Sequence, residues 1–87
     1  MYVILVYDIE EKRVAKMLKL CRRYLNWIQN SVFEGELTEV KLKELLAEAR
    51  KKMDTEKDSI IIFKSREQKW LNKEVIGKEK NDLDNLL

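Results

Sequence analysis

The sequence predicts an α+β domain in which two amphipathic helices cover one face of a β-sheet. Two runs, residues 1–9 and 59–64, are apolar with almost no polar alternation, as in strands that are buried on both faces. Two longer segments, residues 10–25 and 38–53, repeat apolar residues at the spacing of a helix. The 87 residues are enough for one two-layer core, and 45% hydrophobic residues indicate a globular chain.

The first run predicts a central strand, but it contains a carboxylate, Asp8, near its end. Aspartate is a poor strand former and is costly to bury, so its position requires an explanation. Two interpretations are open. Asp8 starts the following helix, where Glu11 three residues later gives a pair similar to a capping box, or Asp8 holds a ligand.

The first predicted helix, residues 10–25, has one apolar and one basic face. Its apolar stripe consists of Val14, Met17, Leu18, Cys21 and Leu25. The opposite face carries six basic residues: Lys12, Arg13, Lys16, Lys19, Arg22 and Arg23. No acidic residue occurs from position 12 to 33, so this span carries +6, whereas the rest has 12 basic and 16 acidic residues, or −4. The face is either a solvated surface or a phosphate-binding one, and its single sign of charge favours the second interpretation.

The middle of the chain predicts two strands, residues 27–29 and 31–37, separated by a turn at Asn30. Gly35 within the second strand indicates a bulge or a close backbone approach. The second helix begins at Thr38, a favourable N-cap residue. Its apolar stripe is Leu42, Leu45, Leu46, Ala49 and Met53, and its last turn carries three basic residues that suit the helix dipole, Arg50, Lys51 and Lys52.

The last part of the chain predicts a second central strand at residues 59–64 and one more strand at residues 70–76. Without the strand at residues 70–76, the element order β-α-β-β-α-β is that of the ferredoxin-like split βαβ fold. In this fold the strands at residues 1–9 and 59–64 lie side by side. A domain of residues 1–77 and a charged tail of residues 78–87 follow, the tail being either frayed or packed on a partner. The uncovered sheet face predicts a homodimer, in which the extra strand adds to the partner's sheet.

The composition excludes several kinds of chemistry. The chain has no His, which removes the usual general base and every Ser-His or Cys-His pair, and the single Cys21 permits no intrachain disulfide. With two glycines, Gly35 and Gly77, there is no glycine-rich phosphate loop. Any enzyme would therefore use carboxylates, Lys, Arg, Tyr or a metal with oxygen ligands. The chain shows neither a signal-peptide pattern nor a membrane-length apolar run, so we expect a cytoplasmic protein without membrane association.

Several motifs together resemble the small CRISPR-associated nuclease and adaptation-scaffold family. They are Val6-Tyr-Asp-Ile9, Arg13 and Lys16 in the next helix, Gln29-Asn-Ser-Val-Phe-Glu-Gly-Glu-Leu-Thr38, and the Asp58-Ser59 step. The resemblance implies a ferredoxin-like homodimer with a magnesium-dependent endonuclease activity on RNA or double-stranded DNA. It also implies a DNA-binding scaffold for the CRISPR integrase during spacer acquisition. The family often has an Arg where this chain has Trp27.

The resemblance also implies which residues act. Asp8 would be the catalytic residue and the metal ligand, with one Mg²⁺ shared between the Asp8 side chains of both chains. The predicted contacts to nucleic-acid phosphates are Arg13 and Lys16, which match family positions, together with Lys12 and Arg23. Two alternatives stay open: a non-catalytic nucleic-acid-binding scaffold, and a ferredoxin-like dimeric regulator outside CRISPR. Tyr7 and Phe33 are predicted to be core residues.

Overall fold

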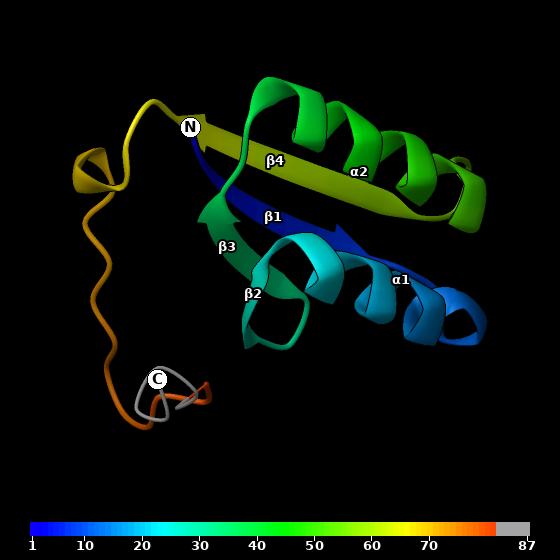
Figure 1. Cartoon of the computed structure of the whole chain (residues 1–87). Coiled ribbons are helices and arrows are strands. Elements are labelled where there is room, and N and C mark those ends of the chain that lie inside the picture. The colour runs from blue at the N-terminus through cyan, green and yellow to red at the C-terminus, as the bar shows by residue number, and fades with distance from the viewer. Residues whose placement is uncertain (82–87) are drawn as a thin grey trace.

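In the computed structural model, which describes residues 1–81, two helices cover one face of a four-stranded antiparallel sheet (Figure 1). The elements along the chain are β1 (Tyr2–Asp8), α1 (Glu11–Tyr24), β2 (Asn26–Gln29), β3 (Val32–Glu36), α2 (Glu39–Lys52), β4 (Ser59–Ser65) and the 3₁₀ turn η1 (Gln68–Trp70). The strand order is β2-β3-β1-β4. The predicted ferredoxin-like arrangement, with β1 beside β4, is confirmed.

The prediction of a central strand at the start of the chain is also confirmed, because β1 pairs with β3 on one side and β4 on the other. Its side chains alternate between the two faces of the sheet. Val3, Leu5 and Tyr7 are buried beneath the helices, whereas Ile4 and Val6 lie half-buried on the opposite face. We call this opposite face the outer face of the sheet.

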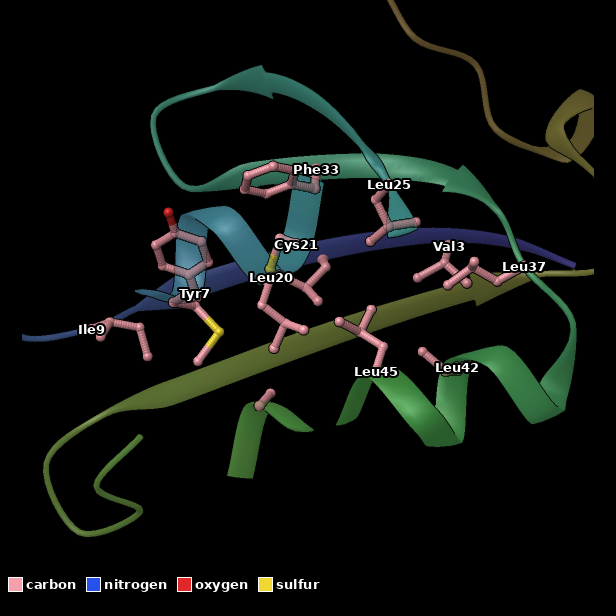
Figure 2. Close-up of a cluster of buried hydrophobic side chains, with 13 residues drawn as sticks. Val3, Tyr7, Ile9, Leu20, Cys21, Leu25, Phe33, Leu37, Leu42 and Leu45 are labelled. Carbon is pink, nitrogen blue, oxygen red and sulfur yellow. The ribbon is translucent and has the colours of Figure 1, made fainter. Parts of the chain in front are cut away.

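The hydrophobic core fills the space between the sheet and the two helices (Figure 2). Phe33 is fully buried and its ring stacks on that of Tyr7, with 5.9 Å between the centroids. Both residues are therefore core residues, as predicted. Replacing a buried Phe by Ala typically costs about 3–5 kcal/mol of stability. The other large side chains that are fully buried are Val3, Leu5, Met17, Leu20, Cys21 and Leu45.

The second helix begins as predicted. The hydroxyl of Thr38 accepts a hydrogen bond from the backbone N–H of Lys41 at 3.1 Å, so Thr38 is the N-cap. Leu37 before the cap and Leu42 after it are both buried in the core. These contacts fix the direction in which the chain enters α2.

The start of the first helix contradicts the interpretation that Asp8 begins it. Glu10 is the N-cap residue and no side chain caps the helix, so Asp8 does not start it and the pair with Glu11 is not a capping box. The reason is that β1 continues through Asp8, which pairs with Ser59 of β4. The carboxylate thus belongs to the strand. The backbone N–H of Glu10 binds the carboxylate of Asp58 instead.

The strand β4 lies at an edge of the sheet, so the prediction of a second central strand is wrong for the described residues. Ile60 and Ile62 pack against the core, but Ile61 and Phe63 are 53% and 56% exposed on the outer face. The run is apolar on both faces, although the described residues bury only the face of β4 that packs against the core.

The predicted additional strand at residues 70–76 is also not formed. Residue 70 ends η1, and residues 71–76 have no regular secondary structure. A strand requires a neighbouring strand edge, whereas here residues 71–74 border a groove with Tyr2 and Ile4. The side chain of Lys73 binds Glu34 of β3 at 2.7 Å.

Two smaller predictions concern β2 and β3. Asn30 adopts a positive φ of 46° in the turn between the strands, as its sequence position indicates. Gly35 is a site of close approach, because a Cβ there would lie 3.1 Å from Cδ2 of Leu25. The alternative of a bulge at Gly35 is wrong, since the register shifts between Trp27 and Gln29.

The predicted tail begins without a helix or strand at residues 78–81, and its remaining residues, 82–87, lie outside the described part. The side-chain amide of Asn81 donates a hydrogen bond to the carbonyl oxygen of Trp27. Within residues 1–81, no helix has the length and apolar character needed to cross a membrane.

Candidate functional site

Asp8 stands at the end of the central strand, on the outer face of the sheet. Its neighbour Tyr7 points into the core, and strand alternation places the Asp8 side chain on the other side, where it is exposed. Among the described residues, no hydrogen bond or ion pair reaches its carboxylate. The group is therefore open to a ligand from solution or from a second chain.

The described part of the chain does not complete a metal site around this carboxylate. Within residues 1–81, no three His, Cys, Asp or Glu side chains converge so that they could hold an ion. Mg²⁺ prefers oxygen ligands and keeps several of its waters, so one or two carboxylates are enough to bind it. Within the described residues Asp8 supplies one such oxygen ligand, and the predicted Mg²⁺ shared between two chains stays a prediction.

Asp58 is a buried carboxylate that the sequence analysis did not single out as a site residue. Its side chain has no exposed surface and accepts four hydrogen bonds. Oδ2 accepts from Arg13 Nε at 2.6 Å and from the backbone N–H of Asp54 at 2.9 Å. Oδ1 accepts from the backbone N–H of Glu10 at 2.9 Å and from Arg13 Nη2 at 3.0 Å. We refer to this arrangement as the Asp58 clamp.

The charges in the clamp stabilise one another. Hydrogen bonding to the Arg13 guanidinium holds the pKa of Asp58 well below its usual range, and the backbone donors act in the same direction against the effect of desolvation. The same bond raises the pKa of Arg13 above its ordinary value. Both groups are consequently charged at neutral pH. The two residues are 45 positions apart, so no local pattern could have predicted the pair.

Arg13 lies on the predicted basic face of α1 and is also bound to two carboxylates. Only 18% of its side chain is exposed, and besides Asp58 it binds Glu10, with Nη2 at 2.7 Å from Oε1. Two carboxylates therefore already neutralise the guanidinium. These partners give Arg13 a structural role, and its predicted contact with phosphate stays a prediction.

The other three predicted phosphate contacts, Lys12, Lys16 and Arg23, are exposed and lie together on α1. They border a groove between the two helices that we call the basic groove. Its lining is Lys12, Arg13, Lys16, Lys19, Leu20, Arg23, Lys51 and Lys52.

The contribution of α2 to the basic groove was missed. The sequence analysis explained Lys51 and Lys52 by the helix dipole alone, because their positions in the last turn suit it. The two lysines share one partner, Glu48, at 3.4 and 3.8 Å, and it neutralises one of the two charges at most. The packing of α1 beside α2 brings these lysines to the groove, and a single helix pattern does not report such packing.

The two candidate sites belong to different sides of the fold. Asp8 lies on the outer face of the sheet, and the basic groove is lined by residues of the two helices that cover the other face. Each is built from its own set of residues.

Comparisons with known proteins agree on one family. Residues 1–73 match the family model described as CRISPR associated protein Cas2. The CRISPR-associated endoribonuclease Cas2 of Thermotoga maritima is 49% identical over 82 residues, which cover 94% of each chain. That of Dictyoglomus turgidum is 44% identical over 87 residues, the whole of both chains.

Solved structures give the same result. A crystal structure of Cas2 has a TM-score of 0.79 at 40% identity and covers 92% of this chain and 90% of its own. The structure of Streptococcus pyogenes Cas2 has a TM-score of 0.75 at 28% identity, with 88% and 100% of the two chains covered.

Proposed function

Because the chain belongs to the Cas2 family of CRISPR-associated proteins, we propose that it is an endonuclease of CRISPR adaptation that hydrolyses phosphodiester bonds in the cytoplasm. Relatives similar over the full chain are named CRISPR-associated endoribonucleases. The observation that carries the proposal is the Asp8 carboxylate, which is exposed at the end of the central strand and has no partner among the described residues.

The enzyme we propose is a homodimer joined through the outer face of the sheet. Ile61 and Phe63 are more than half exposed there, beside Ile4 and Val6 of β1. A contiguous apolar patch of this kind favours burial against another surface. Asp8 is on the same face, so two-fold pairing would bring two Asp8 side chains towards each other.

The free edge of β4 supports a second contact between the two chains. No described strand pairs with its outer edge, and a groove lined by Leu46, Met53, Ile60 and Ile62 lies beside it. Residues 71–76 of the partner, which lack regular structure here, would add to this edge as a strand. This contact would explain why the apolar run of β4 has the pattern of a central strand.

The proposed chemistry depends on the two Asp8 carboxylates. Together they would hold one Mg²⁺, leaving its other positions for water and phosphate oxygens. When bound, such an ion supplies Lewis-acid stabilisation of the phosphate charge and lowers the pKa of a bound water. Asp8 would fix the location of the reaction, and its exposed position would leave space for a phosphodiester.

The basic groove is the proposed binding surface for RNA or double-stranded DNA. Lys12, Lys16 and Arg23 of α1 face Lys51 and Lys52 of α2 across it, and no aromatic side chain lines it. Binding would therefore be to the phosphate backbone, without base stacking or sequence readout.

A second candidate function is a scaffold that binds duplex DNA and the CRISPR integrase without catalysis. The observation that favours it is the separation of the basic groove from Asp8, which leaves the binding surface intact even without a functional metal site. Trp27 also occupies a position where an Arg is common in the family. Its indole N–H instead binds the carbonyl oxygen of Asn30 at 3.0 Å, so this position supplies no cation to a phosphate.

The test compares purified wild type with Asp8→Asn on single-stranded RNA and on double-stranded DNA, with Mg²⁺ or with a chelator. The control is Glu56→Gln, the same chemical change at an exposed loop carboxylate. We expect wild type and control to cleave with Mg²⁺ and Asp8→Asn to fall to the level seen with chelator. Equal cleavage by Asp8→Asn would overturn the role of Asp8, and a lack of cleavage by all three would favour the scaffold.

A further inference from the structure

We propose that Asp58 and Arg13 are positioning residues for Asp8, because their buried ion pair fixes the backbone on both sides of the Asp8 carboxylate. The proposal rests on the proposed function of Asp8 as a metal ligand. In this role, neither Asp58 nor Arg13 would contact the metal or the substrate.

Asp58 is connected to the surroundings of Asp8 in two places. On one side, Asp58 Oδ1 accepts the backbone N–H of Glu10, two residues after Asp8, at 2.9 Å. On the other side, Asp58 directly precedes Ser59, which pairs with Asp8 across the two strands. The buried carboxylate of Asp58 therefore holds the backbone just after Asp8. The same residue lies directly before Ser59, the strand residue that pairs with Asp8.

Asp8 pairs with Ser59 and Ile9 is buried in the core, but the start of α1 has no side-chain cap. β1 ends at Asp8 and α1 begins at Glu11, so the strand changes into a helix within two residues. No side chain of the first turn caps the helix, and the exposed first N–H groups of a helix require partners. Asp58 supplies that partner from a distant part of the sequence, 48 residues from Glu10.

Arg13 fixes the orientation of the Asp58 carboxylate. Its Nε and Nη2 bind the two carboxylate oxygens in a fork, at 2.6 and 3.0 Å, and such a bidentate pair adds geometric specificity to the contact. A Lys would supply charge but not the fork. The carboxylate plane in turn sets the direction of the bond to Glu10.

The position of Asp8 depends on this backbone support because its own side chain has none among the described residues. Metal-binding side chains must be held to within about 0.5 Å of the productive geometry. Loss of a supporting residue typically weakens metal affinity or activity by about 10–100-fold. A clamp on the backbone is thus expected to act on metal affinity, in addition to stability.

The test measures Mn²⁺ binding to the full-length protein by the loss of the free-ion electron paramagnetic resonance signal, without substrate. Asp58→Asn keeps the size of the side chain and removes its charge, and Arg13→Lys keeps the charge and removes the fork. Leu42→Ala removes buried core contacts far from Asp8 and serves as the control for stability. Amide hydrogen exchange at Glu10 reports separately whether the clamp has opened.

We expect Asp58→Asn to weaken Mn²⁺ binding by about 10–100-fold and Arg13→Lys by less, with faster exchange at Glu10 in both. Leu42→Ala should bind Mn²⁺ as wild type does, even if its melting temperature falls as far as that of Asp58→Asn. Faster exchange at Glu10 with unchanged Mn²⁺ affinity would overturn the inference, as would equal weakening by Leu42→Ala. If Asp58→Asn does not fold, the Mn²⁺ affinity of Arg13→Lys and its amide exchange at Glu10 decide the outcome.

The experiment also separates this inference from the function on which it rests. Wild-type binding of Mn²⁺ that Asp8→Asn abolishes supports the metal site independently of the clamp. Wild-type protein that binds no Mn²⁺ through Asp8 would overturn the proposed metal site and this inference with it.

Discussion

The Arg13 guanidinium and the Asp58 carboxylate meet at 2.6 Å, and they join the start of α1 to the start of β4 across 45 residues of sequence. The contact is almost closed to solvent, since Asp58 has no exposed side-chain surface. An ion pair of this kind is expensive to break on one side only, because the remaining charge stays buried without its partner.

The first prediction concerns acid stability. The pKa of Asp58 is well below its usual range in the folded protein, mainly because of the Arg13 hydrogen bond. The ionised carboxylate therefore adds stability above the unfolded-state pKa of about 3.9, and this stability is lost as the pH falls from there towards the lower folded-state pKa. Melting temperatures from circular dichroism between pH 7 and pH 2 should fall more steeply for wild type than for Asp58→Asn. Parallel curves would contradict the prediction.

The second prediction concerns Gly35. A Cβ at this position would lie 3.1 Å from Leu25 Cδ2 and 3.6 Å from Leu25 Cα, so Gly35→Ala overpacks the contact between β3 and the end of α1. We expect a loss of about 1–3 kcal/mol in the free energy of unfolding, measured by urea denaturation.

A double variant tests the cause of that loss. Leu25→Val removes the Cδ2 atom nearest to the new methyl group, so the combination with Gly35→Ala should be less destabilising than the two single changes added together. Strict additivity would mean that Leu25 is not responsible.

The third prediction concerns Cys21. Its side chain is fully buried, and desolvation raises the pKa of its thiol to about 12. The thiolate is the reactive form, so we expect the native protein at pH 8 to resist a thiol reagent such as dithionitrobenzoate. Unfolding in urea should release one reactive thiol per chain. Rapid labelling of the native protein would show that Cys21 is accessible.

The fourth prediction concerns the basic groove. Lys16→Ala on α1 and Lys52→Ala on α2 should each weaken binding to duplex DNA and reduce the slope of log affinity against log salt by about 1. Lys43→Ala, at an exposed lysine of α2 that does not line the groove, is the matched control. Fluorescence anisotropy at several salt concentrations measures both quantities. A control that behaves like the groove variants would indicate a diffuse charge effect instead of a groove.

Local sequence patterns predicted much of the fold because they report local structure. The spacing of apolar residues and the N-cap character of Thr38 depend on a few neighbouring positions, and α2 begins where they indicate. Apolar periodicity does not report what covers a side chain, so β4 was predicted to be central although Ile61 and Phe63 are exposed.

The candidate site was predicted less completely. Asp8 was recognised because a carboxylate interrupts an apolar strand, which is a local signal. Arg13 and Asp58 each belong to a motif of the sequence, but nothing local pairs them, and their relationship exists only after the two segments pack. The same holds for Lys51 and Lys52, whose charge joins that of α1 through the packing of the two helices.

The exposed Ile61 and Phe63 on the outer face of the sheet have a consequence for the amount of protein that a cell must make. If their burial comes from a second copy, stability depends on mass action, and each tenfold dilution removes about 1.4 kcal/mol from the assembled state. Chains synthesised at low abundance would spend longer unpaired, where chaperones and proteases act on them. The protein would then accumulate only above a threshold rate of synthesis, and expression just below that threshold would give a very low steady-state amount of protein.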